Sequence, residues 1–138
     1  MILLDTNVLS ALMKTAPDPA VVQWLDRQPA ESMWTTSITV FEIRTGIDLL
    51  AEGRRRSQLD EMFSDLLAYD LEGRVQAFDQ SAAEAAGAIA ATRQRQGRVV
   101  EIRDVQIAGV AASRHATVAT RNIRHFDGTG VELVNPWG

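Results

Sequence analysis

The chain has 138 residues, with 14 lysine and arginine and 18 aspartate and glutamate side chains, which give a formal net charge of −4 at pH 7. This length suits one domain over residues 1–138, the acidic balance argues against a nonspecific nucleic-acid coat protein, and the lack of cysteine excludes disulfides and thiolate metal sites. Because we find no signal-peptide pattern and no uncharged stretch of about 18 residues, we expect a cytoplasmic protein that does not enter a membrane.

The first half of the chain predicts strands that alternate with helices. In chain order we expect a strand over 2–4, a helix over 18–28, a strand over 33–36, a helix from 37 to near 53, and an amphipathic helical segment over about 57–67. Asp18 and Pro19 are typical of a helix start, and Ser37 is the expected cap of the next helix. The run Arg54 to Arg56 is interpreted as a solvated turn.

The second half continues the alternation. We expect an alanine-rich helix from about Asp79 to Gln96, a helix that starts at Asp104, and two strands over 117–120 and 131–134 with a turn between them at 127–130. Asp79 is interpreted as an N-cap only. Strands alternating with helices predict an α/β fold with a layered, mainly parallel sheet.

A polar cluster, Asp5, Thr6 and Asn7, directly follows the first apolar strand. In open α/β sheets the ligand site lies at the carboxyl ends of the strands, which makes Asp5 a candidate site residue. The alternative is that Asp5 or Thr6 only caps the following helix.

Two further acids are candidates at element ends. Glu42 lies in the first turns of an otherwise apolar helix, and Asp104 begins a nearly uncharged one. Each has a structural alternative, a favourable interaction with the helix dipole for Glu42 and an N-cap for Asp104. Three carboxylates that share one pocket would repel one another unless a cation neutralised them, and oxygen ligands favour Mg²⁺ or Mn²⁺. Such an ion favours hydrolysis of phosphodiesters by an activated water.

Four segments together carry a family resemblance: ILLDTNVLSAL, TTSITVFEIRTGI, RDVQIAGVA and VATRNIRHFD. In this order and spacing the chain resembles the PIN-domain ribonucleases over essentially its whole length. More narrowly it is similar to VapC-type toxins of bacterial toxin–antitoxin modules, and its ending VELVNPW resembles their FitB-like branch.

The resemblance implies a three-layer α/β/α sandwich and a Mg²⁺- or Mn²⁺-dependent endoribonuclease that cleaves single-stranded regions of RNA. By matching motifs it implies metal-binding and catalytic roles for Asp5, Glu42 and Asp104, and supporting roles for Thr6, Asn7, Thr120 and Asn122. Many members have a carboxylate where this chain has Asn122, so the binding of a second metal is in question.

The resemblance also implies toxin homodimers, larger toxin–antitoxin assemblies, and a VapB-like antitoxin whose C-terminal segment blocks the pocket. Arg121 and Arg124 flank Asn122 and are candidates for binding RNA phosphate. His115 and His125 are left out of the site, because a metal ion can activate water without them. The three tryptophans are assigned to core or interface packing.

Two other functional classes stay open. A receiver-like phosphoacceptor or an aspartyl phosphotransferase also has an acid at a strand end, but Lys14 is the only lysine and the DTN motif lacks a second aspartate. The second alternative is a catalytically weak or inactive PIN-like binding module, which the neutral Asn122 keeps under consideration.

Overall fold

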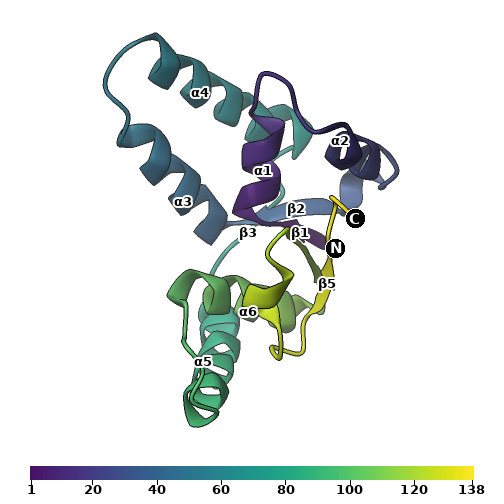
Figure 1. Cartoon of the computed structure of the whole chain (residues 1–138), viewed down its shortest axis with the longest axis vertical. Coiled ribbons are helices and arrows are strands. Elements are labelled where there is room, and N and C mark those ends of the chain that lie inside the picture. Colours follow the sequence, from purple (N-terminus) through teal and green to yellow (C-terminus); the bar gives the residue numbers. More distant parts are fainter.

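The computed structural model describes residues 1–138, and five short strands form its centre (Figure 1). The strands are β1 (Ile2–Leu4), β2 (Met33–Thr36), β3 (Val75–Gln76), β4 (Thr117–Ala119) and β5 (Glu132–Val134). They form a sheet in the order β3-β2-β1-β4-β5, and every neighbouring pair is parallel. Because all the strands are parallel, the residues that follow β1, β2 and β4 meet at one edge of the sheet.

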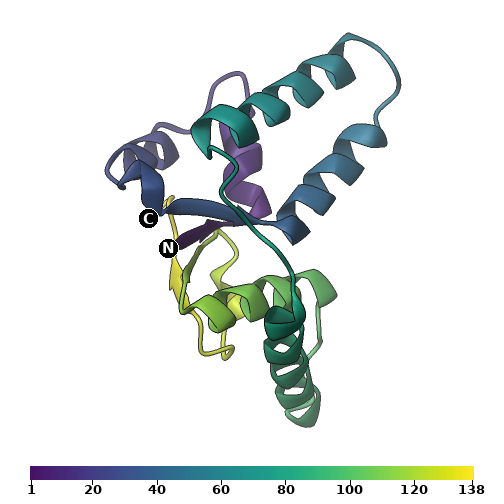
Figure 2. The same cartoon turned by 180° about the vertical axis from the view of Figure 1, so that it is seen from behind.

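Six α-helices cover the two faces of this sheet. They are α1 (Thr6–Leu12), α2 (Pro19–Asp26), α3 (Ser37–Asp48), α4 (Arg54–Asp65), α5 (Gln80–Arg95) and α6 (Ile102–Arg114). Both views place α1 to α4 on one side of the sheet and α5 with α6 on the other (Figures 1 and 2). The predicted three-layer α/β/α sandwich is confirmed. No helix has the length and apolar character that crossing a membrane requires.

The alternation of side chains along the strands separates two cores. Leu4 belongs to the core beneath α1 to α4, together with large side chains such as Ile43 and Phe63. Leu3, its neighbour in β1, belongs to the core beneath α5 and α6, which contains several alanines. Buried side chains on both faces explain why the predicted strand 2–4 is wholly apolar.

Helices α5 and α6 approach each other closely at Gly109. A Cβ atom at Gly109 would lie 2.5 Å from the carbonyl oxygen of Ala82 and 2.6 Å from the Cβ of Ala86. Glycine at this position and alanine opposite it therefore allow the two helices to touch along their backbones.

Several predicted helix boundaries are confirmed and others are wrong. Asp18 and Asp79 cap α2 and α5 as predicted. Thr36, and not Ser37, caps α3, because the Thr36 hydroxyl accepts a hydrogen bond from the Thr39 amide at 3.1 Å. The Ser37 hydroxyl instead accepts a hydrogen bond from the Phe78 amide and ties α3 to the segment after β3.

The region around Gly53 also differs from the prediction. Helix α3 ends at Asp48, and a new helix begins at Arg54 after Gly53, whose φ is 150°. The Gly53 carbonyl accepts a hydrogen bond from the Ser57 amide at 3.1 Å, which closes the first turn of α4. The run Arg54 to Arg56, interpreted as a solvated turn, is therefore the first turn of α4, in which Arg54 and Arg55 are exposed and Arg56 is partly buried. Three short helical turns complete the chain: η1 (Ala30–Ser32), η2 (Leu66–Asp70) and η3 (Ile123–Phe126).

Candidate active site

Asp5 lies at the junction of β1 and α1 and is 5% exposed. Its Oδ1 accepts a hydrogen bond from the Thr6 amide at 2.8 Å, so it caps α1. Its Oδ2 accepts hydrogen bonds from the Thr120 hydroxyl at 2.8 Å and from the Asn7 side-chain amide at 3.2 Å. Burial raises the pKa of Asp5, and these three hydrogen bonds partly oppose the rise. Capping therefore does not exclude Asp5 from the site, because the carboxylate has further contacts across the sheet.

The supporting residues in the first turn of α1 and directly after β4 form one hydrogen-bonded unit around Asp5. The Asn7 side-chain amide also donates to the Thr120 hydroxyl at 3.2 Å, and its oxygen accepts from the Arg121 amide at 3.0 Å. The Thr120 hydroxyl accepts from the Asn122 amide at 3.0 Å. Residues more than 110 positions apart in the chain thus fix the orientation of the Asp5 carboxylate.

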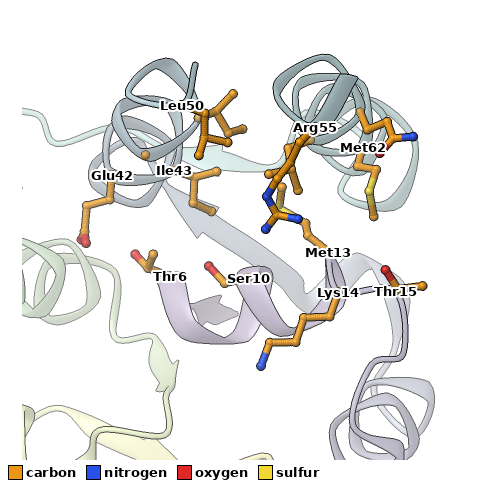
Figure 3. Close-up of a pocket in the computed structure, with 14 residues that line it drawn as sticks. Thr6, Ser10, Met13, Lys14, Thr15, Glu42, Ile43, Leu50, Arg55 and Met62 are labelled. Carbon is orange, nitrogen blue, oxygen red and sulfur yellow. The ribbon is translucent and has the colours of Figure 1, made fainter. Parts of the chain in front are cut away.

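Glu42 reaches this edge from α3, on one face of the sheet. The close-up shows its carboxylate pointing toward the first turn of α1, where Thr6 lies (Figure 3). Burial raises the pKa of Glu42, the charge of Asp5 raises it further, and Arg103 lowers it. Arg103 Nη1 lies 3.6 Å from Glu42 Oε2, and its guanidinium carbon lies 5.9 Å from the centre of the Phe41 ring.

Asp104 reaches the same edge from α6, on the opposite face of the sheet. The prediction that Asp104 starts this helix is wrong: the helix begins at Ile102, and the Glu101 carbonyl accepts the first helical hydrogen bond, from Val105. Asp104 consequently lies within the first turn, and its carboxylate is not used as a cap. Burial raises the pKa of Asp104, with smaller contributions from the charges of Asp5 and Glu101.

His125 is a contact of the site that the sequence prediction left out. It lies in η3, and its Nδ1 is 3.1 Å from Asp104 Oδ2. This contact lowers the pKa of Asp104 against the effect of burial. Its position 21 residues after Asp104 gave no local signal, although both belong to segments that carried the family resemblance.

The three acids fit a hard divalent cation in their chemistry. Asp5 raises the pKa of both Glu42 and Asp104, so its charge is felt by an acid on each face of the sheet. As they stand, no three histidine, aspartate or glutamate side chains converge closely enough to hold an ion. Arg103 and His125 contact the two outer carboxylates instead. A divalent cation would offset the repulsion among the three carboxylates, which offer it only oxygen donors.

The two candidate phosphate-binding arginines are placed differently. The Arg121 guanidinium carbon lies 5.0 Å from the centre of the Trp137 ring, so Arg121 packs over the C-terminal segment. Arg124 is exposed and lines a cleft that also contains Asp104 and His125. Arg124 is therefore the better placed of the two for a ligand at the acids.

A larger groove of about 610 Å³ lies between α1, α3 and α4. Glu42 and Thr6 lie at one end, while Arg55, Met62 and Lys14 lie toward the other (Figure 3). Its wall on α3 contains Ile43, Gly46 and other small or apolar residues. The groove thus combines apolar side chains with polar and basic ones and ends at one of the three acids.

Comparison with known proteins agrees with this geometry. Residues 2–131 match the PIN domain family. The chain is 36% identical over 137 residues to the VapC ribonuclease Y4jK of Sinorhizobium fredii, which covers 99% of this chain and 98% of that protein. It is 35% identical to the toxin FitB of Neisseria gonorrhoeae, with 99% of both chains covered. The crystal structure of FitAcB from Neisseria gonorrhoeae superposes with a TM-score of 0.90 over 99% of each chain. With the family match spanning nearly its whole length, this chain belongs to the PIN-domain family.

Proposed function

We propose that this protein is the toxin of a bacterial toxin–antitoxin module and acts as a Mg²⁺- or Mn²⁺-dependent endoribonuclease. The observation that carries the proposal is the placement of Asp5, buried at the end of β1, between Glu42 on one face of the sheet and Asp104 on the other. The identity to a VapC ribonuclease and to the toxin FitB supports the same activity. We further propose one PIN-like domain over residues 1–138 that works in the cytoplasm, where its RNA substrate would be.

Asp5 and Asp104 would bind the metal ion directly, with Glu42 as the third ligand. A bound ion of this kind supplies a Lewis acid for a phosphate oxygen and lowers the pKa of an attacking water. Thr6, Asn7 and Thr120 hold the Asp5 carboxylate in one orientation, so it does not have to reorganise when RNA binds. Asn122 joins this unit through its backbone amide, which donates to the Thr120 hydroxyl.

Glu42 and Asp104 must exchange partners before they can bind a cation. Arg103 and His125 contact them in the protein alone; these two side chains are 50% and 55% exposed, whereas the Glu42 and Asp104 side chains are 20% and 17% exposed. Water screens each contact on the side of its exposed partner, which lowers its net contribution to stability. A divalent cation can therefore displace them, and the freed Arg103 guanidinium is then available to the RNA backbone.

A VapB-like antitoxin is the proposed protein partner. The groove between α1, α3 and α4 offers apolar side chains to a helical segment and ends at Glu42, where a basic side chain of the partner would meet the acids. A solved relative is described as FitAcB, which supports a toxin that works with a second component. We also propose a toxin homodimer within a larger toxin–antitoxin assembly.

The activity can be tested with purified protein and a mixture of bacterial RNAs. Cleavage that requires Mg²⁺ or Mn²⁺ and stops on addition of EDTA is the expected result. In cells, expression of the chain alone should arrest growth, and Glu42→Gln at the same soluble level should relieve the arrest. A folded protein that leaves RNA intact with both metals would instead support an inactive PIN-like binding module.

A further inference from the structure

A second cleft, of about 370 Å³, lies beside Asp104 on the side away from the groove of Figure 3. It is formed by the end of α5, the following loop, the first turn of α6 and η3, and we call it the basic cleft. Arg93, Arg98 and Arg124 line it together with Asp104 and His125. Only two of its eight lining residues are hydrophobic, compared with six of the fourteen that line the larger groove on the other side of the acids.

Arg93 is a buried cation that no carboxylate neutralises. Its residue is 7% exposed, and its Nη2 donates to the backbone carbonyls of His125 at 3.1 Å and Asp127 at 2.7 Å. Its Nε is buried without any hydrogen-bond partner. Buried arginines are normally paired with an acid, so this one leaves a positive charge at the base of the basic cleft.

Arg98 and Arg124 add two further guanidinium groups at the rim. Arg98 lies over Gly128, where a Cβ atom would fall 2.5 Å from its Nη1. Its only acidic contact is a long one, 3.9 Å from Nη2 to Asp127 Oδ2, and the Asp127 side chain is 78% exposed. Arg124 is exposed and has no ion pair. The three arginines therefore outnumber Glu101 and Asp104, the two acids of the cleft.

The basic cleft is continuous with the acidic site through His125. The imidazole of His125 contacts Asp104, while its backbone carbonyl accepts a hydrogen bond from Arg93. A nucleic-acid strand with one phosphate at the acids can thus place a neighbouring phosphate among the arginines without leaving the surface. Planar guanidinium groups at an exposed rim suit phosphate oxygens, which they can bind in pairs.

We propose that the basic cleft is a second phosphate subsite, which holds an RNA internucleotide phosphate next to the one that is cleaved. Arg98 and Arg124 contact the phosphate, and Arg93 is a positioning residue that fixes the 125–127 backbone and adds positive charge beneath it. This inference rests on the proposed ribonuclease function. It also assigns a path to the RNA, which runs from the three acids toward η3 and away from the larger groove.

The first experiment measures binding without cleavage. Variants are made in an Asp5→Asn background, and binding of a fluorescein-labelled, unstructured 12-nucleotide RNA is followed by anisotropy in EDTA at several salt concentrations. The double change Arg98→Gln with Arg124→Gln should weaken binding about tenfold at low salt, because charge-assisted hydrogen bonds to phosphate are lost. The slope of log K against log salt should fall by about 0.7 for each lost phosphate contact to single-stranded RNA.

A matched control comes from the same helix as Arg93. Arg95 is exposed, lies outside the basic cleft and forms no ion pair, so Arg95→Gln removes one charge without removing a proposed contact and is compared with Arg98→Gln and Arg124→Gln made singly. Its effect on affinity and on the salt slope should be clearly smaller. The pair Arg98→Lys with Arg124→Lys keeps both charges and should recover the salt slope with only part of the affinity.

A second experiment locates the phosphate in the RNA. One internucleotide linkage at a time is replaced by an uncharged methylphosphonate in the same RNA. One replacement should weaken binding to the Arg95→Gln control and have no further effect on the Arg98→Gln, Arg124→Gln variant.

Unchanged affinity and salt slope in the double variant, while the unmutated protein still cleaves RNA with metal, would overturn the subsite and leave the proposed function standing. The subsite would also be wrong if the methylphosphonate effect were the same in both variants. If the unmutated protein neither binds nor cleaves RNA, the proposed function and the subsite fall together.

Discussion

The two faces of the sheet carry one outer acid each and are packed in different ways. On the face with α5 and α6, alanines and Gly109 allow direct contact of the two helices, and α6 carries Asp104. On the face with α1 to α4, large side chains such as Phe63 form the core, and a groove of about 610 Å³ stays open beside α3, which carries Glu42. Asp5 lies between the two faces, and its carboxylate is held by neutral hydrogen bonds from the first turn of α1 and from Thr120, directly after β4.

This difference indicates separate roles for the two sides of the site. A closely packed helix fixes the position of Asp104, next to a polar cleft that suits RNA phosphate. Glu42 borders the larger groove, whose apolar side chains suit a protein segment, so a partner bound there would act on the site through Glu42. The asymmetry follows from side-chain size, because glycine and alanine remove the space that larger residues leave at the other face.

The largest expected effect on activity comes from changing Asp5, which lies between the two faces of the sheet. Asp5→Asn should reduce metal-dependent RNA cleavage by about a thousandfold, equivalent to about 4 kcal/mol of transition-state stabilisation, because the buried metal ligand loses its charge. Single-turnover cleavage rates measure this. Asp104→Asn and Glu42→Gln, made in parallel, should lose activity as well. A folded Asp5→Asn protein that cleaves at the original rate would remove Asp5 from the site.

The packing contrast itself can be tested with two glycines in helices on opposite faces. Gly109→Ala should lower the free energy of unfolding by about 1–3 kcal/mol, because the new methyl group overlaps the backbone of α5. Gly46→Ala, in α3, should raise it by about 0.5–1 kcal/mol, because nothing lies within 4 Å of the new Cβ and alanine favours the helix. Urea unfolding of the three proteins gives both values. Equal destabilisation by the two changes would contradict the contrast.

The buried charge of Asp5 predicts a pH dependence of stability in the absence of metal. Since the pKa of Asp5 is raised above the ordinary value of about 3.9, its stabilising contribution is complete below that value and is lost as the pH rises through the folded-state pKa. The free energy of unfolding of the unmutated protein should therefore fall relative to that of Asp5→Asn as the pH increases.

Urea unfolding of both proteins in EDTA between about pH 4 and pH 8 measures this difference. Addition of Mn²⁺ at the upper end should stabilise the unmutated protein more than the variant, because the ion binds the folded state. A difference in stability that does not change with pH would show that Asp5 carries no buried charge in this range.

The smallest expected effect concerns Asn122, which follows β4 and contacts the Thr120 hydroxyl beside Asp5. Asn122→Asp adds a carboxylate and should tighten Mn²⁺ binding about fivefold, in line with about 1 kcal/mol for two charges in water. Calorimetric titration without RNA measures it. Gln23→Glu, an equal charge change in α2 away from the site, is the control. If the two variants bind Mn²⁺ with the same affinity, Asn122 is not near the metal.

Local patterns predicted most of the fold. The apolar run before Asp5, the Asp18–Pro19 helix start and the Asp79 cap all lie where expected, because each depends on neighbouring residues alone. The errors are also local. Helix α1 and the two-residue strand β3 are too short to give a periodic pattern, and Gly53, expected near the end of one helix, instead directly precedes the start of α4. Boundaries at Thr36 and Glu101 were displaced by one to three residues, where several residues compete to cap.

The sequence by itself determined the order of four of the five strands and five of the six helices, the family resemblance and the choice of three candidate acids, because these depend on residue type and spacing along the chain. Only the tertiary structure decided which groups contact those acids: Thr120 on Asp5, Arg103 on Glu42 and His125 on Asp104. It also decided that Arg93 is buried without a carboxylate partner. The three candidate acids lie between the larger groove and the basic cleft. The physical reason is that burial and charge pairing depend on distances in space, and the parallel sheet brings residues more than 100 positions apart to one edge.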